Sequence, residues 1–131
     1  MVKILVVTHG NLAVEFINVA KKVTEQSIDA VPICLDLTSS QPSPSEKIRE
    51  TLTSLKNDQS AIILTDLFGG TPSNITIPFI QKDKVEVITG INLSMILYII
   101  SRQKEKSFKE LCEGAKKAGE EGIIIAGEFL S

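Results

Sequence analysis

Residues 61–74, AIILTDLFGGTPSN, place a short unbroken apolar run directly before a polar, glycine-rich turn. The run is rich in β-branched side chains, which is typical of a strand buried on both faces of a parallel sheet. The turn contains Gly-Gly and Thr-Pro, which interrupt regular structure and favour a loop. This stretch predicts a strand at 61–65, a loop that begins at Asp66, and a helix that begins at about Pro72.

Similar apolar runs recur along the chain and alternate with amphipathic segments. The runs lie at residues 4–7, 28–35, 61–65 and 85–89, with a late one at 122–126. Apolar residues at helical spacing mark 12–23, and the segments SPSE at 43–46 and SFKE at 107–110 read as capping boxes that open further helices. The alternation predicts an α/β fold with a doubly wound, mostly parallel sheet in the order 2-1-3-4. The last run is expected to add a fifth strand at an edge, and the pattern alone does not choose its direction.

Composition narrows the class of protein. With 131 residues, 43% of them hydrophobic, the chain has the size of one ordinary domain spanning 1–131. The formal net charge is -2 and the charges are interspersed, so no basic stripe indicates a nucleic-acid partner. The apolar runs are too short for a membrane span or a secretion signal, which favours a cytoplasmic protein without membrane insertion. Cys34 and Cys112 have no metal-ligand spacing and are expected to be buried thiols.

Polar residues follow three of the predicted strands at the point where each strand ends. His9, the only histidine, follows the first strand, Asp66 follows the third, and Asn92 lies just after the fourth. The carboxyl ends of parallel strands meet at one edge of the sheet, where ligands bind in open α/β folds. With the first and third strands adjacent, at about 4.8 Å, His9 and Asp66 are expected to lie within reach of each other.

An imidazole beside a carboxylate suits phosphoryl transfer. One ring nitrogen attacks phosphorus only if the other carries the proton, and the carboxylate accepts that proton in a hydrogen bond and stabilises the resulting cation. The transferred group also needs hydrogen-bond donors. Gly69 and Gly70 permit the backbone to turn its N–H groups toward an anion, and Thr71 and Ser73 add hydroxyls. Phosphate-binding, dinucleotide-binding, hydrolase and zinc motifs are missing from the sequence, which disfavours a nucleotide or metal enzyme.

Three segments together resemble the mannose-type IIA domains of the bacterial phosphoenolpyruvate-dependent sugar phosphotransferase system (PTS). They are THG at 8–10, TDLFGGTPSN at 65–74 and TGINLSMIL at 89–97. The resemblance covers essentially the whole chain, and it departs from the family at Ser94, where proline is frequent. It implies that His9 accepts a phosphoryl group from the phosphocarrier protein HPr and passes it to the IIB component, without a metal or nucleotide cofactor.

The resemblance also assigns roles within the site and in assembly. It makes Asp66 the hydrogen-bond partner of His9, and it puts Gly69, Gly70 and Thr71 in the loop beside the phosphoryl group. It further implies a homodimer whose fifth strand is antiparallel and exchanged between subunits.

Two alternatives keep the fold but change the function. A receiver-type signalling domain would be phosphorylated on Asp66, but that chemistry needs an acidic pair after the first strand, where this chain has His9 and Gly10. A regulatory module, either a sensor or a subunit like the phosphotransfer subunit of a dihydroxyacetone kinase, would use the same histidine and remains open.

Overall fold

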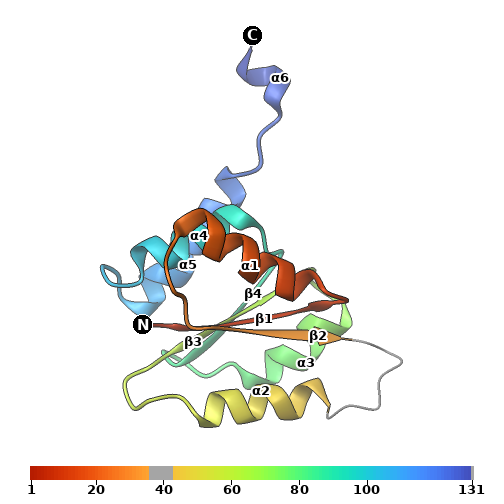
Figure 1. Cartoon of the computed structure of the whole chain (residues 1–131), viewed down its shortest axis with the longest axis vertical. Helices are drawn as coiled ribbons and strands as arrows, with labels where there is room; N and C mark the ends of the chain where they lie inside the picture. The colour runs from red at the N-terminus through yellow and green to blue at the C-terminus, as the bar shows by residue number, and fades with distance from the viewer. Residues whose placement is uncertain (36–42, 131) are drawn as a thin grey trace.

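The structure is a computed structural model in which residues 1–35 and 43–130 are described. In this part of the chain four parallel strands form one sheet in the order β2-β1-β3-β4 (Figure 1). The strands are β1 (Lys3–His9), β2 (Ala30–Leu35), β3 (Ala61–Thr65) and β4 (Val85–Thr89). The predicted α/β class, parallel sheet and strand order are confirmed. The loop expected at 36–42 lies outside the described residues.

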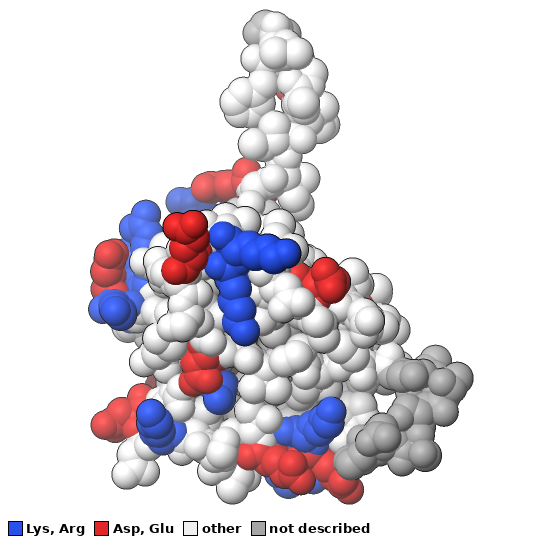
Figure 2. Space-filling model, viewed as in Figure 1, with Lys and Arg blue, Asp and Glu red and all other residues white. Residues whose placement is uncertain are grey.

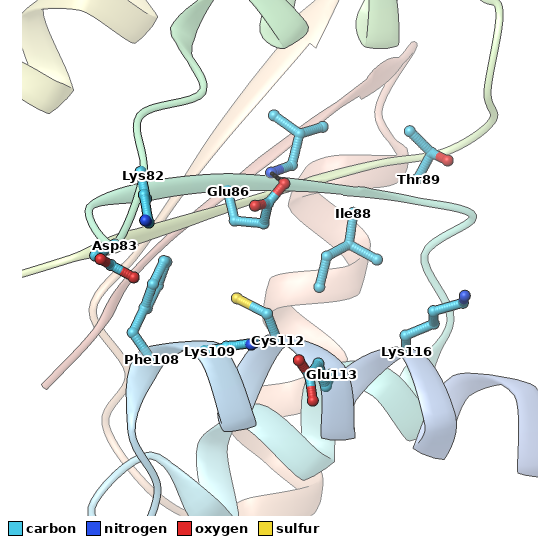
Figure 3. Close-up of a pocket in the computed structure, with 11 residues that line it drawn as sticks. Lys82, Asp83, Glu86, Ile88, Thr89, Phe108, Lys109, Cys112, Glu113 and Lys116 are labelled. Atoms are coloured by element: carbon cyan, nitrogen blue, oxygen red, sulfur yellow. Dashed lines mark hydrogen bonds between the residues drawn. The ribbon is translucent and has the colours of Figure 1, made fainter.

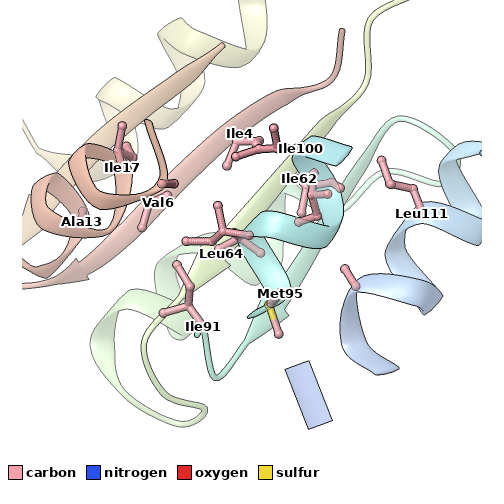
Figure 4. Close-up of a cluster of buried hydrophobic side chains, with 14 residues drawn as sticks. Ile4, Val6, Ala13, Ile17, Ile62, Leu64, Ile91, Met95, Ile100 and Leu111 are labelled. Carbon is pink, nitrogen blue, oxygen red and sulfur yellow. The ribbon is translucent and has the colours of Figure 1, made fainter. Parts of the chain in front are cut away.

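Helices cover both faces of this sheet (Figure 1). One face carries α1 (Leu12–Thr24), α4 (Leu93–Arg102) and α5 (Phe108–Glu121). The other carries α2 (Pro44–Thr53), α3 (Thr71–Thr76) and the 3-10 turn η1 (Ile77–Phe79). Alternate side chains of each strand point to opposite faces, so the sheet separates two apolar clusters. Figure 4 shows the cluster beneath α1, α4 and α5, with Ile4 and Val6 of β1 facing these helices.

Local signals in the sequence explain several element boundaries. Ser43 accepts a hydrogen bond from the Glu46 N–H at the start of α2, and at α5 both bonds of the Ser107–Glu110 capping box are present. Pro32 lies within β2, where its missing N–H is tolerated because β2 is an edge strand. The capping box expected at α5 is therefore confirmed, and at α2 the structure shows the Ser43 bond of the expected box.

The carboxyl-terminal segment, residues 123–130, is called the arm below. It leaves the end of α5 and projects away from the body (Figure 1). Its exposed large apolar side chains are 56% to 88% accessible. They are Ile123, Ile124, Ile125, Phe129 and Leu130. Figure 2 shows the arm as a mostly uncharged projection, whereas both signs of charge are spread over the body.

The fifth strand expected at 122–126 is not formed within the described chain. Gly122 and Ile123 continue from α5 with helix-type hydrogen bonds, and Ala126 begins the short helix α6 (Ala126–Phe129). A strand requires a neighbour for its backbone N–H and C=O groups, and the arm points away from the sheet of its own chain (Figure 1). The sequence pattern marked an apolar segment correctly, but a single chain supplies no strand beside it.

Candidate active site

His9 and Asp66 meet at the carboxyl edge of the sheet, as the strand order predicts. His9 is the last residue of β1, and Asp66 directly follows the last residue of β3. The two strands are parallel neighbours in a register that pairs Val7 with Thr65, so both chains leave the sheet at nearly the same level. The imidazole is 48% exposed while the Asp66 side chain is 10% exposed. The site therefore presents an open imidazole against a shielded carboxylate.

Hydrogen bonds hold the Asp66 carboxylate on both of its oxygens. Oδ2 accepts the backbone N–H of His9 at 2.9 Å and lies 2.8 Å from Nδ1 of the same residue. Oδ1 accepts the backbone N–H of Leu67 at 3.0 Å. An ionised carboxylate only accepts, so the hydrogen bond assigns the proton to Nδ1 of the neutral imidazole. Nε2 then carries the free lone pair.

The charge state of Asp66 follows from the same contacts. Burial raises the pKa of this carboxyl, but the hydrogen bonds from the His9 backbone and ring, the Coulombic attraction of a protonated His9 ring and the Leu67 N–H outweigh burial. The net effect lowers the pKa of Asp66 below its ordinary value of 3.8. Asp66 is therefore ionised at neutral pH, and it can stabilise a positive charge that develops on the imidazole.

The glycine-rich loop after Asp66 closes against the imidazole. A Cβ placed on Gly70 would stand 3.2 Å from Cε1 of His9, so only a residue without a side chain fits there without displacing the ring. Gly69 has a φ of +86°, in the left-handed region that favours glycine. Thr71 is exposed and is the first residue of α3. Of the three predicted loop residues, Gly70 thus lies next to the imidazole, and Gly69 and Thr71 precede and follow it in the chain.

Two groups expected to face an anion, the Gly69 N–H and the Ser73 hydroxyl, form hydrogen bonds within the loop. Both were expected to supply donors to an anion. Instead the Gly69 N–H donates to Ser73 Oγ at 2.9 Å, and the Ser73 hydroxyl donates to the Gly70 carbonyl at 3.1 Å. Ser73 is fully buried. Both groups find partners within the loop because Ser73, at the third position of α3, reaches back over the turn.

The third polar segment, near Asn92, serves the scaffold. The Asn92 side chain caps α4 by accepting the Met95 N–H, and it donates to the Gly119 carbonyl in α5. At the other end of the site, Thr8 Oγ1 accepts the Ala13 N–H in the first turn of α1. Thr8 belongs to the THG segment at 8–10, but the sequence did not predict that its hydroxyl would bond to α1.

Other features of the surface lie away from His9. A groove of about 620 Å³ runs between β4 and α5, and Figure 3 shows Glu86 and Ile88 of β4 facing Phe108 and Cys112 of α5 across it. Within residues 1–35 and 43–130, no three His, Cys, Asp or Glu side chains are grouped to hold a metal ion. In the same residues no helix has the length and apolarity needed to cross a bilayer.

Known proteins resemble this chain in sequence and in fold. The family described as the PTS system fructose IIA component (EIIA-man) matches residues 3–116. The PTS system fructose-specific EIIA component of Bacillus subtilis (strain 168) is 28% identical over 86 residues, which is 65% of this chain and 59% of that protein. The chain therefore spans less than two thirds of the length of this relative.

Solved structures share the fold over nearly the full chain. The phosphotransferase system component EIIA from Streptococcus agalactiae has a TM-score of 0.79 at 26% identity and covers 98% of this chain and 99% of its own. The mannose/sorbose specific IIA subunit from Enterococcus faecalis has a TM-score of 0.79 at 20% identity, covering 95% and 93%. From the match over residues 3–116 and this shared fold, the chain belongs to the fructose- and mannose-type IIA family of the PTS, whose members are phosphotransferases.

Proposed function

We propose that this chain is a cytoplasmic phosphocarrier in which His9 accepts a phosphoryl group from HPr and passes it to a IIB component for coupled sugar uptake and phosphorylation. The observation that carries the proposal is the pairing of His9 Nδ1 with the shielded Asp66 carboxylate at 2.8 Å. This pairing leaves Nε2 as the nucleophile on an imidazole that is half exposed to an incoming protein. Membership in the IIA family supports the reaction class.

The transfer consists of one bond made and one bond broken. The Nε2 lone pair of His9 attacks phosphorus on the phosphorylated donor, the bond from phosphorus to the donor breaks, and the donor keeps that electron pair. The imidazole retains its Nδ1 proton and becomes cationic, and the Asp66 carboxylate stabilises this charge through the 2.8 Å contact. In the second step the acceptor on IIB attacks the same phosphorus and the neutral imidazole of His9 leaves.

The loop contributes geometry and donors to this site. In the proposal, Gly69, Gly70 and Thr71 lie beside the phosphoryl group. Gly69 supplies the left-handed turn, while its N–H is bonded to Ser73. The backbone at Gly70 and Thr71, which opens α3, and the exposed Thr71 hydroxyl are the groups assigned to the anion.

A labelling reaction tests the proposal. Incubation with phosphoenolpyruvate, enzyme I and HPr is expected to label the chain once, and His9→Ala is expected to abolish the label. The label should be lost in acid and survive base, because a phosphoramidate behaves in this way and an acyl phosphate does not. Asp58→Asn is the control, because Asp58 is exposed and precedes β3, whereas Asp66 follows that strand. Label retained by the His9→Ala variant would refute the assignment.

Transfer to purified IIB proteins separates uptake from regulation. A IIB component that takes the phosphoryl group from labelled protein supports the transport role. Labelling without transfer to any IIB would favour the regulatory alternative, in which the phosphorylated histidine controls a partner. In the proposal, the sugar binds other components of the system and not this chain. The IIB protein that accepts the phosphoryl group therefore also identifies the pathway that the chain serves.

We also propose that the protein is a homodimer in which the arm of each copy supplies the missing edge strand. β4 is an edge strand with open backbone groups, and the groove beside it has apolar lining from Ile88, Phe108 and Cys112 (Figure 3). The arm carries exposed isoleucines at three successive positions. Exposure of this apolar surface to water is unfavourable, and burial against a second copy would remove it from water.

Sedimentation tests the homodimer. Ile124→Asp is expected to convert dimer to monomer, because it puts a charge into the centre of the exchanged segment. Val23→Asp is the matched control, because Val23 is 59% exposed on α1 and lies outside the arm. A wild-type protein that sediments as a monomer, or an Ile124→Asp dimer as stable as wild type, would contradict the exchange.

A further inference from the structure

Ser73 carries a buried hydroxyl with two partners, and both partners belong to the loop that touches the imidazole. Its side chain has no exposed surface. Oγ accepts the Gly69 N–H at 2.9 Å and donates to the Gly70 carbonyl at 3.1 Å. One hydroxyl on α3 therefore ties together the two consecutive glycines of the turn. We call this pair of hydrogen bonds the serine clamp.

The serine clamp acts on the part of the loop that faces His9. Gly70 is the residue whose added Cβ would stand 3.2 Å from Cε1, the ring carbon between the two nitrogens. Nδ1, one of the two nitrogens bonded to Cε1, forms a hydrogen bond with the Asp66 carboxylate. Gly70 therefore lies next to the imidazole and leaves the space that a side chain would take from the ring. A ring that rotated about its Cβ–Cγ bond would lose the Asp66 contact, so the carboxylate sets the orientation of the ring and the position of Gly70 sets how much room it has.

We propose that Ser73 is a positioning residue for His9: its clamp holds Gly70 against the imidazole and thereby keeps Nε2 directed at the incoming phosphorus. The kinetic part of this inference rests on the proposed phosphocarrier function. Without the hydroxyl, the Gly69 N–H and the Gly70 carbonyl lose the partner that links them, and this part of the loop gains conformational freedom. In-line phosphoryl transfer depends on orientation, and displacements of about 1 Å cost about 100-fold in rate.

The test compares two buried hydroxyls on the same short helix. Ser73→Ala removes the clamp. Thr76→Val removes a hydroxyl that is also fully buried, but that bonds only to the Pro72 and Ser73 carbonyls within α3. Ser73→Cys keeps the side-chain size with a weaker hydrogen-bonding group, and it replaces the alanine variant if that variant does not fold. Each protein is studied as the full chain.

Two readouts are measured on each variant. The first is the nuclear Overhauser effect between the Cε1 proton of the imidazole and the α-protons of Gly70. His9 is the only histidine, so its ring signal is unambiguous. The second is the single-turnover rate of phosphoryl transfer from phosphorylated HPr, resolved into a maximal rate and a half-saturating concentration. The first readout needs no phosphoryl transfer.

Ser73→Ala is expected to weaken the Overhauser effect and to lower the maximal rate about 10- to 100-fold, with the half-saturating concentration nearly unchanged. Thr76→Val should keep both readouts at wild-type values, and Ser73→Cys should fall between. A Ser73→Ala variant with the wild-type effect and rate would overturn the proposal, as would equal losses in Thr76→Val. If wild-type protein accepts no phosphoryl group, the proposed function fails, and the Overhauser effect alone then decides whether the clamp positions the ring.

Discussion

Replacing Asp66 by asparagine removes one negative charge and leaves too few hydrogen-bond acceptors for the N–H groups that surround this side chain. Oδ2 accepts two N–H groups from His9, and Oδ1 accepts one from Leu67. An amide has a single oxygen. If that oxygen faces His9, the NH₂ group confronts the Leu67 N–H, and if it faces Leu67, the NH₂ group confronts both donors of His9. The second orientation also favours the wrong tautomer, with the proton on Nε2.

The rate penalty of Asp66→Asn follows from the bond that is lost. A hydrogen bond to a charged group contributes about 1.5–3 kcal/mol, and the contact with Nδ1 strengthens as the imidazole becomes cationic. We therefore expect the transfer rate to fall about 10- to 150-fold.

Rapid-quench single-turnover transfer from phosphorylated HPr measures this penalty. Asp58→Asn, an exposed aspartate, is the control and should transfer at the wild-type rate. The folded state holds the Asp66 pKa below its ordinary value, so the carboxylate stabilises the fold above about pH 4 and loses this effect as the pH falls through its folded pKa. An Asp66→Asn variant with unchanged transfer rate would remove Asp66 from the mechanism and refute this reasoning.

Four further substitutions have definite expected outcomes. Thr8→Val should lower the free energy of unfolding in urea by about 1–3 kcal/mol, because it leaves a buried N–H of α1 without its acceptor. Thr65→Val should be neutral or stabilising, because the buried Thr65 hydroxyl has no hydrogen-bond partner among the described residues. Equal losses of stability in the two variants would contradict this. Gly70→Ala should slow transfer by displacing the imidazole, at little cost in unfolding free energy; wild-type transfer would show that the ring is not confined. Burial raises the pKa of Asp29, but hydrogen bonds from Lys3 and Gln59 and the charge of Lys3 lower it overall. Asp29→Asn should therefore destabilise the fold at pH 7, and the difference in unfolding free energy from wild type should shrink as the pH falls below 3.8. A difference that does not change with pH would argue against the ion pair.

The meeting of His9 and Asp66 was predictable because it depends on few assumptions. Parallel strands end at one edge of the sheet, and the order 2-1-3-4 makes β1 and β3 neighbours. Given that order, the residue that ends β1 and the residue that follows β3 must lie close together. The capping boxes were equally predictable, because their hydrogen bonds join residues three positions apart.

The role of Ser73 and the form of the arm were beyond the sequence pattern for physical reasons. Whether a hydroxyl faces an anion or its own loop depends on the direction in which α3 leaves the turn, and residue type does not encode that direction. The arm reads as a strand because its isoleucines have high β-propensity, but propensity is realised only beside a neighbouring strand. The described chain holds no such neighbour for residues 123–125.

The most direct test of the account is the position of phosphorus on the imidazole. Phosphorus and nitrogen NMR on protein carrying ¹⁵N-labelled histidine reports one ring, because the chain has one histidine. The account predicts a phosphorus–nitrogen coupling to Nε2 and a proton retained on Nδ1 in contact with Asp66. Phosphorus on Nδ1, or on any residue other than His9, would contradict it.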